Sequence, residues 1–396
     1  MTETTRTTDP ANKGRVEPPV ANGGPKTTKE RLARMLPALG SLQGYIGLVL
    51  VVLIGIITKG QIFWNQTNLT NAITAFASRG ILAVGVTLVI LTGGIDLSVG
   101  SVLGIGSMTA AMLLTHLNLT PWLIVPLCAL VGAFFGLCNG IGTTWLRIQS
   151  FVMTLAMLSV VRGIDRQVSD NVAVGTQLTD AQGHLTGQAA AFAKLGTPGH
   201  NLLRGNWLPL FGQVGIGYPV IALVVVCVVF QLVLSKTRFG RHVYAVGGNP
   251  TAAKLSGVNV TAVTIAVFAL SGLLAGFAGP IDAAYSASAD PLAGTSYELD
   301  AIAAAVIGGT SLAGGKGTVT GTFVGALILT LLDNVLGLNQ ISDNLQLITK
   351  GLIVVLAVVI QRPDFFRSLV SGARRLRRGR NLKSTVDKQK AEGAPQ

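Results

Sequence analysis

Four polar side chains interrupt apolar stretches of the sequence and could contact a hydroxylated molecule. Asp96 and Ser98 lie in the segment GGIDLSVGS, whereas Asn139 and Asn334 lie within longer apolar runs. Hydroxyl groups need hydrogen-bond donors and acceptors but no net charge, and amide and hydroxyl side chains provide both. These four residues are therefore candidates for lining a substrate path. Asp96 has a second interpretation, because its carboxylate, assisted by Ser98, could cap the helix that follows.

Two opposite charges lie in consecutive apolar runs near the sequence's end. Asp333 comes about four residues before the end of one run, and Lys350 about four residues after the start of the next. A charge at the centre of a membrane helix costs about 2.5–3.5 kcal/mol on insertion scales. Antiparallel neighbours would place the two at similar depth, so we predict an ion pair that braces the structure, with a role in transport as the alternative. Glu298 and Asp300 begin another run, where acidic groups favour a helix N-terminus; they could also face a partner protein.

Two short segments resemble catalytic motifs but lack residues that those motifs require. TSLAGGKG at 310–317 has Thr310 and Gly317 where a phosphate-binding loop needs Gly and Ser or Thr. GTSLA at 309–313 lacks the last glycine of a nucleophile elbow. The three cysteines, an odd number in apolar stretches, indicate packing rather than disulfides or a metal site. We expect no enzyme activity, no ATPase motif, no cofactor and no metal.

The composition is that of a membrane protein. Hydrophobic residues make up 49% and charged residues 12% of the 396, whereas soluble domains carry roughly 25% charged residues. Of the net charge of +13, residues 1–40 supply +3 and residues 362–396 supply +7. Basic residues that flank the apolar region, rather than cover one folded face, argue against nucleic-acid binding. The bilayer is the solvent that accommodates such a sequence.

Ten apolar runs are long enough to cross, or nearly cross, a hydrocarbon core of roughly 30 Å. They lie at about 38–57, 71–91, 99–115, 121–145, 151–164, 218–235, 259–279, 298–312, 318–337 and 346–361. Two of them, 151–164 and 298–312, are short, which is typical of interrupted helices around a cavity. We therefore predict an all-α membrane protein of about ten transmembrane helices over residues 38–361.

The distribution of Lys and Arg predicts that both ends are cytoplasmic. With ten spans, 23 of these residues fall in inside segments and five in outside segments, as the positive-inside rule expects. This topology gives a disordered N-terminal tail at 1–37, a periplasmic insertion at 165–217 that resembles an ordered cap or loop and suggests a lid or docking surface, and a basic C-terminal tail at 362–396. GIDLSVGS at 94–101 and GTSLAGGKG at 309–317 form a weak internal echo, so a two-fold pseudo-repeat is also expected.

The segment RFGRHVYAVGGNPTAAKLSGV at 238–258 falls on the predicted cytoplasmic side. Gly247–Gly248 predicts a sharp turn, Asn249 a helix cap, and Pro250 the first helical residue. Gly257 would end this helix after one to two turns. A short capped helix between two spans could contact a cytosolic motor, but the pattern alone does not separate this from a solvated loop.

Four segments, in order, resemble permeases of the ribose/xylose/arabinose/galactose group of bacterial ABC importers. They are GILAVGVTLVILTGGIDLSVGSVLG at 80–104, QSFVMTLAMLSVVRGI at 149–164, the segment at 238–258, and ELDAIAAAVIGGTSLAGGKGTVTG at 298–321. The resemblance extends from about residue 45 to 361. The long insertion, together with LDN at 332–334, looks closest to the xylose permease branch.

The resemblance implies a type II importer fold in the bacterial inner membrane, with two permease chains, expected to be a homodimer within the lipid. It also implies a cytoplasmic ABC ATPase and a periplasmic sugar-binding protein, with a monosaccharide, a pentose such as xylose, as cargo. The residues that the resemblance assigns to ATPase coupling are Gly248, Asn249, Pro250, Thr251, Ala252, Lys254 and Leu255.

Two other classes of function fit less well. An ion-coupled secondary transporter would need a buried carboxylate or His relay in mid-membrane. The four His residues lie in or near loops, and carboxylates within the spans are few. A membrane enzyme would need a constellation of His, Asp, Glu or Cys at suitable spacing, and no such pattern stands out. The basic run ARRLRRGR at 373–380 favours an anionic cytoplasmic leaflet.

Overall fold

The computed structural model describes residues 28–196, 201–203 and 216–360, in two units that divide at residue 40. Of the first unit only 28–40 are described, and they begin helix α1 (Thr28–Phe63), which has a non-helical residue at Lys59. Residues 28–37, expected to belong to a disordered tail, are therefore helical. The rest of that tail and the basic C-terminal tail lie outside the described residues.

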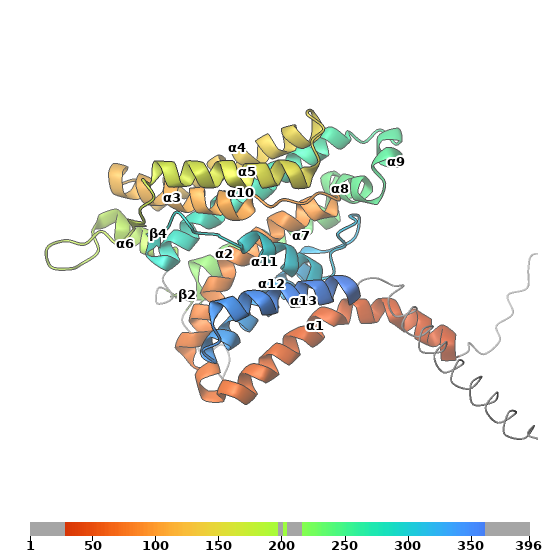
Figure 1. Ribbon diagram of the computed structural model, residues 1–396, viewed down its shortest axis with the longest axis horizontal. Coiled ribbons are helices and arrows are strands. Elements are labelled where there is room, and N and C mark those ends of the chain that lie inside the picture. The colour runs from red at the N-terminus through yellow and green to blue at the C-terminus, as the bar shows by residue number, and fades with distance from the viewer. Residues whose placement is uncertain (1–27, 197–200, 204–215, 361–396) are drawn as a thin grey trace, which may run out of the picture. The chain divides into compact units, whose positions relative to one another are not determined.

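Thirteen helices and four short strands occur in the described part of the chain (Figure 1). After α1 the helices are α2 (Gln66–Leu91), α3 (Val99–Leu117), α4 (Pro121–Thr144), α5 (Ser150–Val168), α6 (Gly187–Ala193), α7 (Tyr218–Lys236), α8 (Arg238–Gly248), α9 (Pro250–Leu255), α10 (Val260–Ser286), α11 (Tyr297–Ile307), α12 (Val319–Leu338) and α13 (Asp343–Ile360). The strands are β1 (Val174–Gly175), β2 (Asn201–Leu203), β3 (Ile216–Gly217) and β4 (Ser288–Ala289).

Polar side chains fix where several helices begin. Asn65 accepts a hydrogen bond from the amide of Thr67 at the start of α2, and Asn259 accepts one from the amide of Ala262 at the start of α10. Thr318 caps α12 in the same way. In each case the side chain satisfies an amide that has no partner within the helix.

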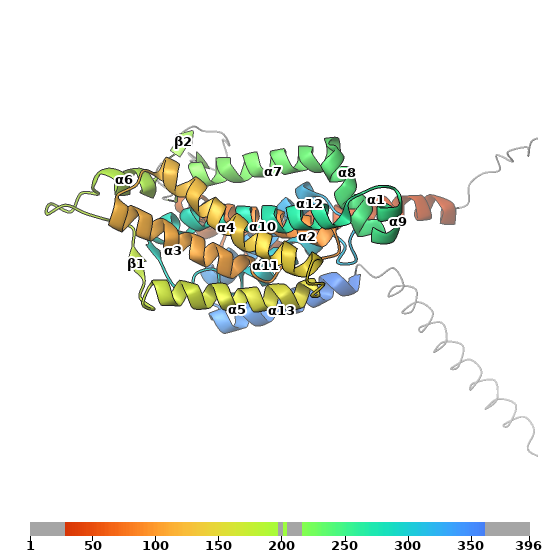
Figure 2. The same ribbon diagram turned by 90° about the horizontal axis from the view of Figure 1, so that it is seen from above.

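Helices α2 and α10 lie in the middle of the second unit in both views (Figures 1 and 2). The side chains of α2 are almost all buried from Phe76 to Leu91. Helix α4 approaches α10 at backbone distance, because a Cβ at Gly136 would overlap the Phe268 carbonyl, and a Cβ at Gly272 would overlap the backbone of α4. Small residues permit this close packing of membrane helices, where lipid leaves little hydrophobic driving force.

Each of the ten predicted apolar runs overlaps a helix among the described residues, although the run at 298–312 extends five residues beyond the end of α11. Seven of these helices are long and apolar enough to cross a membrane, namely α1 from Tyr45 onward, α2, α3, α4, α7, α10 and α12. Helices α5, α11 and α13 are not among the seven. Helix α11 has 11 residues, or about 16 Å at 1.5 Å per residue, which matches the predicted interrupted helix. That all ten cross the membrane stays a prediction.

The insertion after α5 is ordered where it is described. Strand β1 pairs with β4 in antiparallel register, with Val174 opposite Ala289, and β2 pairs with β3. In α6, the fully buried Phe192 packs in an apolar cluster with Met108 and Ile124. Helix α5 continues to Val168, so the insertion begins later than the predicted residue 165. That the insertion forms a periplasmic cap stays a prediction.

Helices α8 and α9 lie at one end of the second unit, and α6 and β2 lie at the other (Figures 1 and 2). The positive-inside count predicts opposite sides of the membrane for these same two groups. We refer to the two ends as the inner end and the outer end.

Candidate functional site

The segment predicted to meet a motor forms two helices, α8 and α9. The chain bends at Asn249, whose backbone is extended (φ −161°, ψ 103°). Gly247 and Gly248 end α8, so the predicted turn at these glycines is wrong by one to two residues. The predicted cap is confirmed, because Asn249 Oδ1 accepts a hydrogen bond of 2.9 Å from the amide of Ala252. Gly257 has φ +85° and follows the end of α9 as expected.

Helix α9 presents most of its surface to the outside of the chain. The seven predicted coupling residues, from Gly248 to Leu255, are all exposed, and Ala253, which is not one of them, is buried. Leu255 is 85% exposed, although the burial of a leucine side chain is favourable. Helix α8 is held to the body by Val243 and Val246, which join the main apolar core. The pair therefore offers an anchored surface at the inner end.

Three of the four predicted path residues meet at the interruption between α2 and α3: Asp96 and Ser98 lie in it, and Asn139 reaches it from α4. The amide and Oγ of Ser98 donate to Asp96 Oδ1 at 3.0 and 2.7 Å, and Asn139 Nδ2 donates to Ser98 Oγ at 2.8 Å. Ser271 of α10, which the sequence did not single out, donates to Asp96 Oδ2 at 3.0 Å. All four are 1% exposed or less. The network joins α3, α4 and α10 at the helix break.

This burial corrects one of the expectations for Asp96. Ser98 is the N-cap residue of α3 and makes no side-chain capping bond. The carboxylate of Asp96 accepts from the amide of Ser98 itself rather than from an amide in the first turn of α3. In this conformation the network holds the break together and is closed to a solute, and its role as a path stays a prediction.

The fourth predicted path residue, Asn334, lies apart from this network. Its amide and that of Asn68 on α2 exchange two hydrogen bonds, of 3.0 and 2.7 Å. Asn68 also donates to the Phe63 carbonyl at the end of α1. Asn334 therefore fastens α12 to α2.

The predicted ion pair is confirmed and belongs to a larger cluster. Lys350 Nζ lies 3.0 Å from Asp333 Oδ2 and 3.1 Å from Asp300 Oδ2. Arg79 Nη1 lies 2.6 Å from Asp333 Oδ2, and its guanidinium is 5.0 Å from the centre of the Tyr297 ring. Asp300 lies in the first turn of α11, as predicted. Sequence reasoning assigned no partner to Arg79, although a charge within an apolar run signals that one exists.

This charge cluster of Arg79, Asp300, Asp333 and Lys350 connects α2, α11, α12 and α13. A cavity beside Arg79 and Asp300 measures about 10 Å³, which is room for about one water molecule. A sugar does not fit there in this conformation. The predicted structural brace is thus the role that the observed contacts support.

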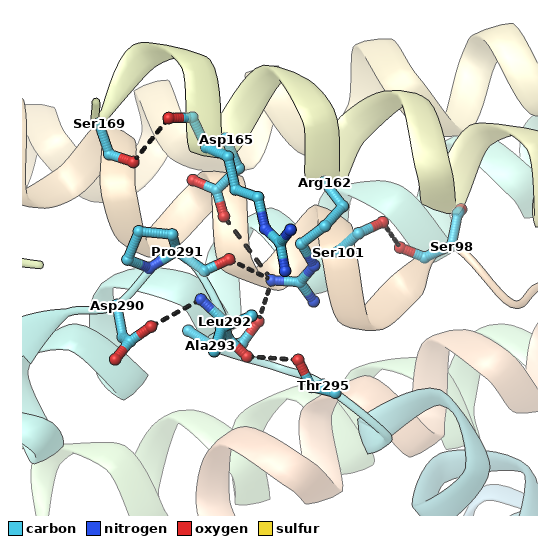
Figure 3. Close-up of polar contacts among 11 residues, drawn as sticks. Ser98, Ser101, Arg162, Asp165, Ser169, Asp290, Pro291, Leu292, Ala293 and Thr295 are labelled. Carbon is cyan, nitrogen blue, oxygen red and sulfur yellow. Dashed lines mark hydrogen bonds and ion pairs between the residues drawn. The ribbon is translucent and has the colours of Figure 1, made fainter. Parts of the chain in front are cut away.

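Arg162 on α5 fixes the segment that precedes α11, as Figure 3 shows. Its Nη1 donates to the carbonyls of Pro291 at 2.9 Å and Ala293 at 2.7 Å, and lies 3.7 Å from Asp165 Oδ2. Asp290 tightens the same segment by accepting from the Leu292 amide at 2.7 Å. The sequence carried no signal for the carbonyl partners of Arg162.

One segment of the internal echo, 309–317, contacts the end of the helix that precedes the other segment. The amide of Gly315 donates to the Leu91 carbonyl at the end of α2, at 2.9 Å. Each segment follows one helix and precedes the next: α2 and α3 in one case, α11 and α12 in the other. The pseudo-repeat itself stays a prediction.

Comparison with known protein families shows the family of this chain. A family model described as "Branched-chain amino acid transport system / permease component" matches residues 68–358. The chain belongs to this permease family. It is a transport component of the bacterial inner membrane and crosses that membrane several times.

Sugar permeases are among the relatives. The ribose import permease protein RbsC of Escherichia coli (strain K12) is 40% identical over 314 residues, which cover 79% of this chain and 91% of that protein. RbsC of Haemophilus influenzae is 39% identical over 313 residues, covering 79% and 90%. The xylose transport system permease protein XylH of Haemophilus influenzae is 35% identical over 366 residues, covering 81% and 96%. No solved structure matches the chain.

These values confirm the resemblance to sugar-importer permeases but not to its xylose branch. The ribose permeases are more similar to the chain than the xylose permease is. The insertion and the LDN segment therefore did not identify the branch.

Proposed function

We propose that this chain is the transmembrane permease subunit of an ATP-binding-cassette importer that moves a monosaccharide into the cell. The observation that carries the proposal is the exposed, capped helix α9 at the inner end of a permease-family chain. Exposed Leu255 and Lys254 beside the Asn249 cap make a small docking surface for a cytoplasmic ATPase. The chain supplies the path, and the ATPase supplies the free energy.

The proposed cargo is a pentose delivered by a periplasmic binding protein at the outer end. Relatives named for ribose and for xylose support this class, and ribose is the first sugar to test. A pentose is uncharged, so its path needs hydrogen-bonding groups rather than a buried charge. Two copies of the permease would form the complete path between them, since the buried polar groups within one chain bond to one another and leave no opening for a sugar.

The experiment measures ATP hydrolysis by the purified complex in lipid, with binding protein that carries ribose, xylose or no sugar. Wild type is compared with Leu255→Asp, which places a charge on the exposed face of α9. Leu117→Asp, at an exposed leucine at the outer end of α3, is the matched control. We expect Leu255→Asp to lose most of the co-purifying ATPase, and Leu117→Asp to retain it.

Stimulation of the wild type by ribose-loaded binding protein supports the whole proposal. Stronger stimulation by xylose-loaded binding protein would support the importer assignment but would show that xylose, and not ribose, is the cargo. The alternative, an ion-coupled secondary transporter, predicts the opposite pattern: no ATPase co-purifies, and a proton or sodium gradient alone drives uptake by this chain. Equal ATPase recovery in both variants would remove α9 as the docking helix.

A further inference from the structure

Three stretches of backbone meet where α8 ends. They are the end of α2 at Leu91, Gly247 and Gly248 of α8, and Gly314 and Gly315 of the loop between α11 and α12. The Gly315 amide donates to the Leu91 carbonyl. A Cβ at Gly247 would overlap that same carbonyl and would lie 2.5 Å from the Gly315 amide nitrogen. No side chain separates the three stretches.

A side chain of α8 reinforces this junction. The Tyr244 hydroxyl donates to the Gly317 carbonyl at 2.8 Å, two residues beyond Gly315. Burial raises the pKa of the Tyr244 phenol, so the hydroxyl keeps the proton that it donates. Tyr244 lies one turn before Gly248 on α8. One face of a single helix therefore holds the loop at two points.

The loop between α11 and α12 has a conformation that fits these contacts closely. Gly314 and Gly315 have φ of +84° and +72°, which other residues adopt only at a cost of about 1–2 kcal/mol. A Cβ at Gly314 would lie 2.9 Å from the Gly247 carbonyl oxygen and from the Gly93 amide nitrogen. The loop is thus in contact both with α8 and with the start of the other interruption.

The interruption between α2 and α3 is in turn hydrogen-bonded to α5. The Ile95 amide donates to Ser150 Oγ at 3.2 Å, and the Leu97 amide donates to Thr154 Oγ1 at 3.1 Å. A displacement of α8 would therefore press on the α11–α12 loop and on the end of α2. Through the α2–α3 interruption it would reach α5, whose Arg162 holds the segment before α11.

We propose that Tyr244 and Gly247 are positioning residues through which the ATPase acts on both helix interruptions at once. The inference rests on the proposed function and extends it, because the coupling residues expected from the sequence begin only at Gly248. Backbone contacts that leave no room for a side chain transmit displacement without a rotamer change that could absorb it. Coupling between distant sites must be measured, since contact alone does not demonstrate it.

The test compares sugar uptake with ATP hydrolysis in proteoliposomes that contain permease, ATPase and loaded binding protein. Tyr244→Phe removes one hydroxyl and leaves the ring; Tyr285→Phe, at an exposed tyrosine of α10, is its control. Gly247→Ala inserts one methyl group into the junction; Gly337→Ala, at an open position on α12, is its control. The thermal midpoint and the recovery of ATPase are recorded for every variant.

We expect Tyr244→Phe to lower sugar transported per ATP hydrolysed about fivefold, as the loss of one hydrogen bond of ordinary strength implies. ATPase recovery and hydrolysis without binding protein should stay at wild-type values, and the thermal midpoint should fall by no more than the loss of one hydrogen bond implies. A purely structural defect would lower recovery and midpoint together with uptake. Gly247→Ala should lower the ratio further, and both controls should keep it. If Gly247→Ala fails to assemble, Tyr244→Phe alone decides.

Two failures are distinguishable. A wild type that assembles no ATPase overturns the proposed function, and the inference with it. A coupled wild type whose Tyr244→Phe variant keeps the same ratio of sugar to ATP overturns the inference alone. A fall in thermal midpoint that accounts for the lost uptake would do so as well.

Discussion

The outer and inner parts of this permease are held together by different chemistry. Towards the outer end, charged side chains connect four helices through the cluster of Arg79, Asp300, Asp333 and Lys350. At the inner end, the junction of α2, α8 and the α11–α12 loop consists of backbone in contact with backbone at glycine. Ion pairs in a low-dielectric site are strong but need both partners, whereas a glycine junction depends only on the absence of a side chain.

The difference matters for what each part can do. Breaking the charge cluster would leave an unpaired charge in the membrane. The four helices that the cluster connects are therefore suited to stay together. The inner junction involves close approach and two neutral hydrogen bonds to the α11–α12 loop, at Gly315 and Gly317, so small relative shifts of the backbones cost less. We infer that the outer cluster acts as a brace and that the inner junction is the part that moves.

The largest expected effect comes from breaking the outer cluster. Lys350→Met leaves Asp300 without its lysine and Asp333 with Arg79 alone. Loss of one partner from a buried ion pair costs about 3–5 kcal/mol, so the denaturation midpoint of the purified permease should fall steeply. Asp343→Asn, at an exposed carboxylate in the first turn of the same helix, is the control and should lower the midpoint far less, since such a charge contributes at most about 1 kcal/mol.

A second substitution sharpens this test. Adding Asp300→Asn to Lys350→Met removes the unpaired carboxylate but keeps the pair of Arg79 and Asp333 at 2.6 Å. The double variant should therefore be more stable than Lys350→Met alone, a non-additivity expected for groups in contact. If the double variant is the less stable of the two, the cluster is not a balanced charge network.

The inner junction should respond to volume instead of charge. Gly315→Ala would strain a residue at φ +72° and would place a Cβ 2.9 Å from the Gly248 amide nitrogen. The expected loss is about 2 kcal/mol, within the range for non-glycine residues held in this region. Gly163→Ala, at an open position on α5, should instead be neutral or slightly stabilising. Equal midpoints for the two variants would mean that the loop at Gly315 has room to relax.

The two regions also differ in how far the sequence predicts them. Asp333 and Lys350 are visible as charges within apolar runs, so residue type and spacing are enough to predict their pairing. Arg79 is equally visible, but the choice of its partner depends on which helices are neighbours. Gly247 has no side chain whose chemistry could reveal a partner. The sequence supports a local turn there, and tertiary contact with Leu91 instead keeps the residue in α8.

Local signals were the most dependable part of the sequence. Asn249 caps the helix that follows it as predicted, because such a cap is decided by a few neighbouring residues, and the structure shows the same cap at Asn259. Asp96 shows the limit of such reasoning, since its carboxylate bonds to Ser271, 175 residues away, as well as to Ser98. The partners of Arg162 are backbone carbonyl groups, which every residue has, so the sequence could not identify them.

The smallest expected effect is the loss of an asparagine cap, which can be compared on a short helix and on a long one. Asn249→Ala and Asn259→Ala each remove a side-chain acceptor worth about 1 kcal/mol. Helix α9 has six residues and α10 has 27, and short helices depend more on their first turn. Amide hydrogen exchange should therefore rise about fivefold, the equivalent of 1 kcal/mol, across all of α9 in the first variant. In the second it should rise only in the first turn of α10. Uniform protection of α9 in Asn249→Ala would mean that contacts with α8, rather than the cap, keep the docking helix folded at the moving inner end.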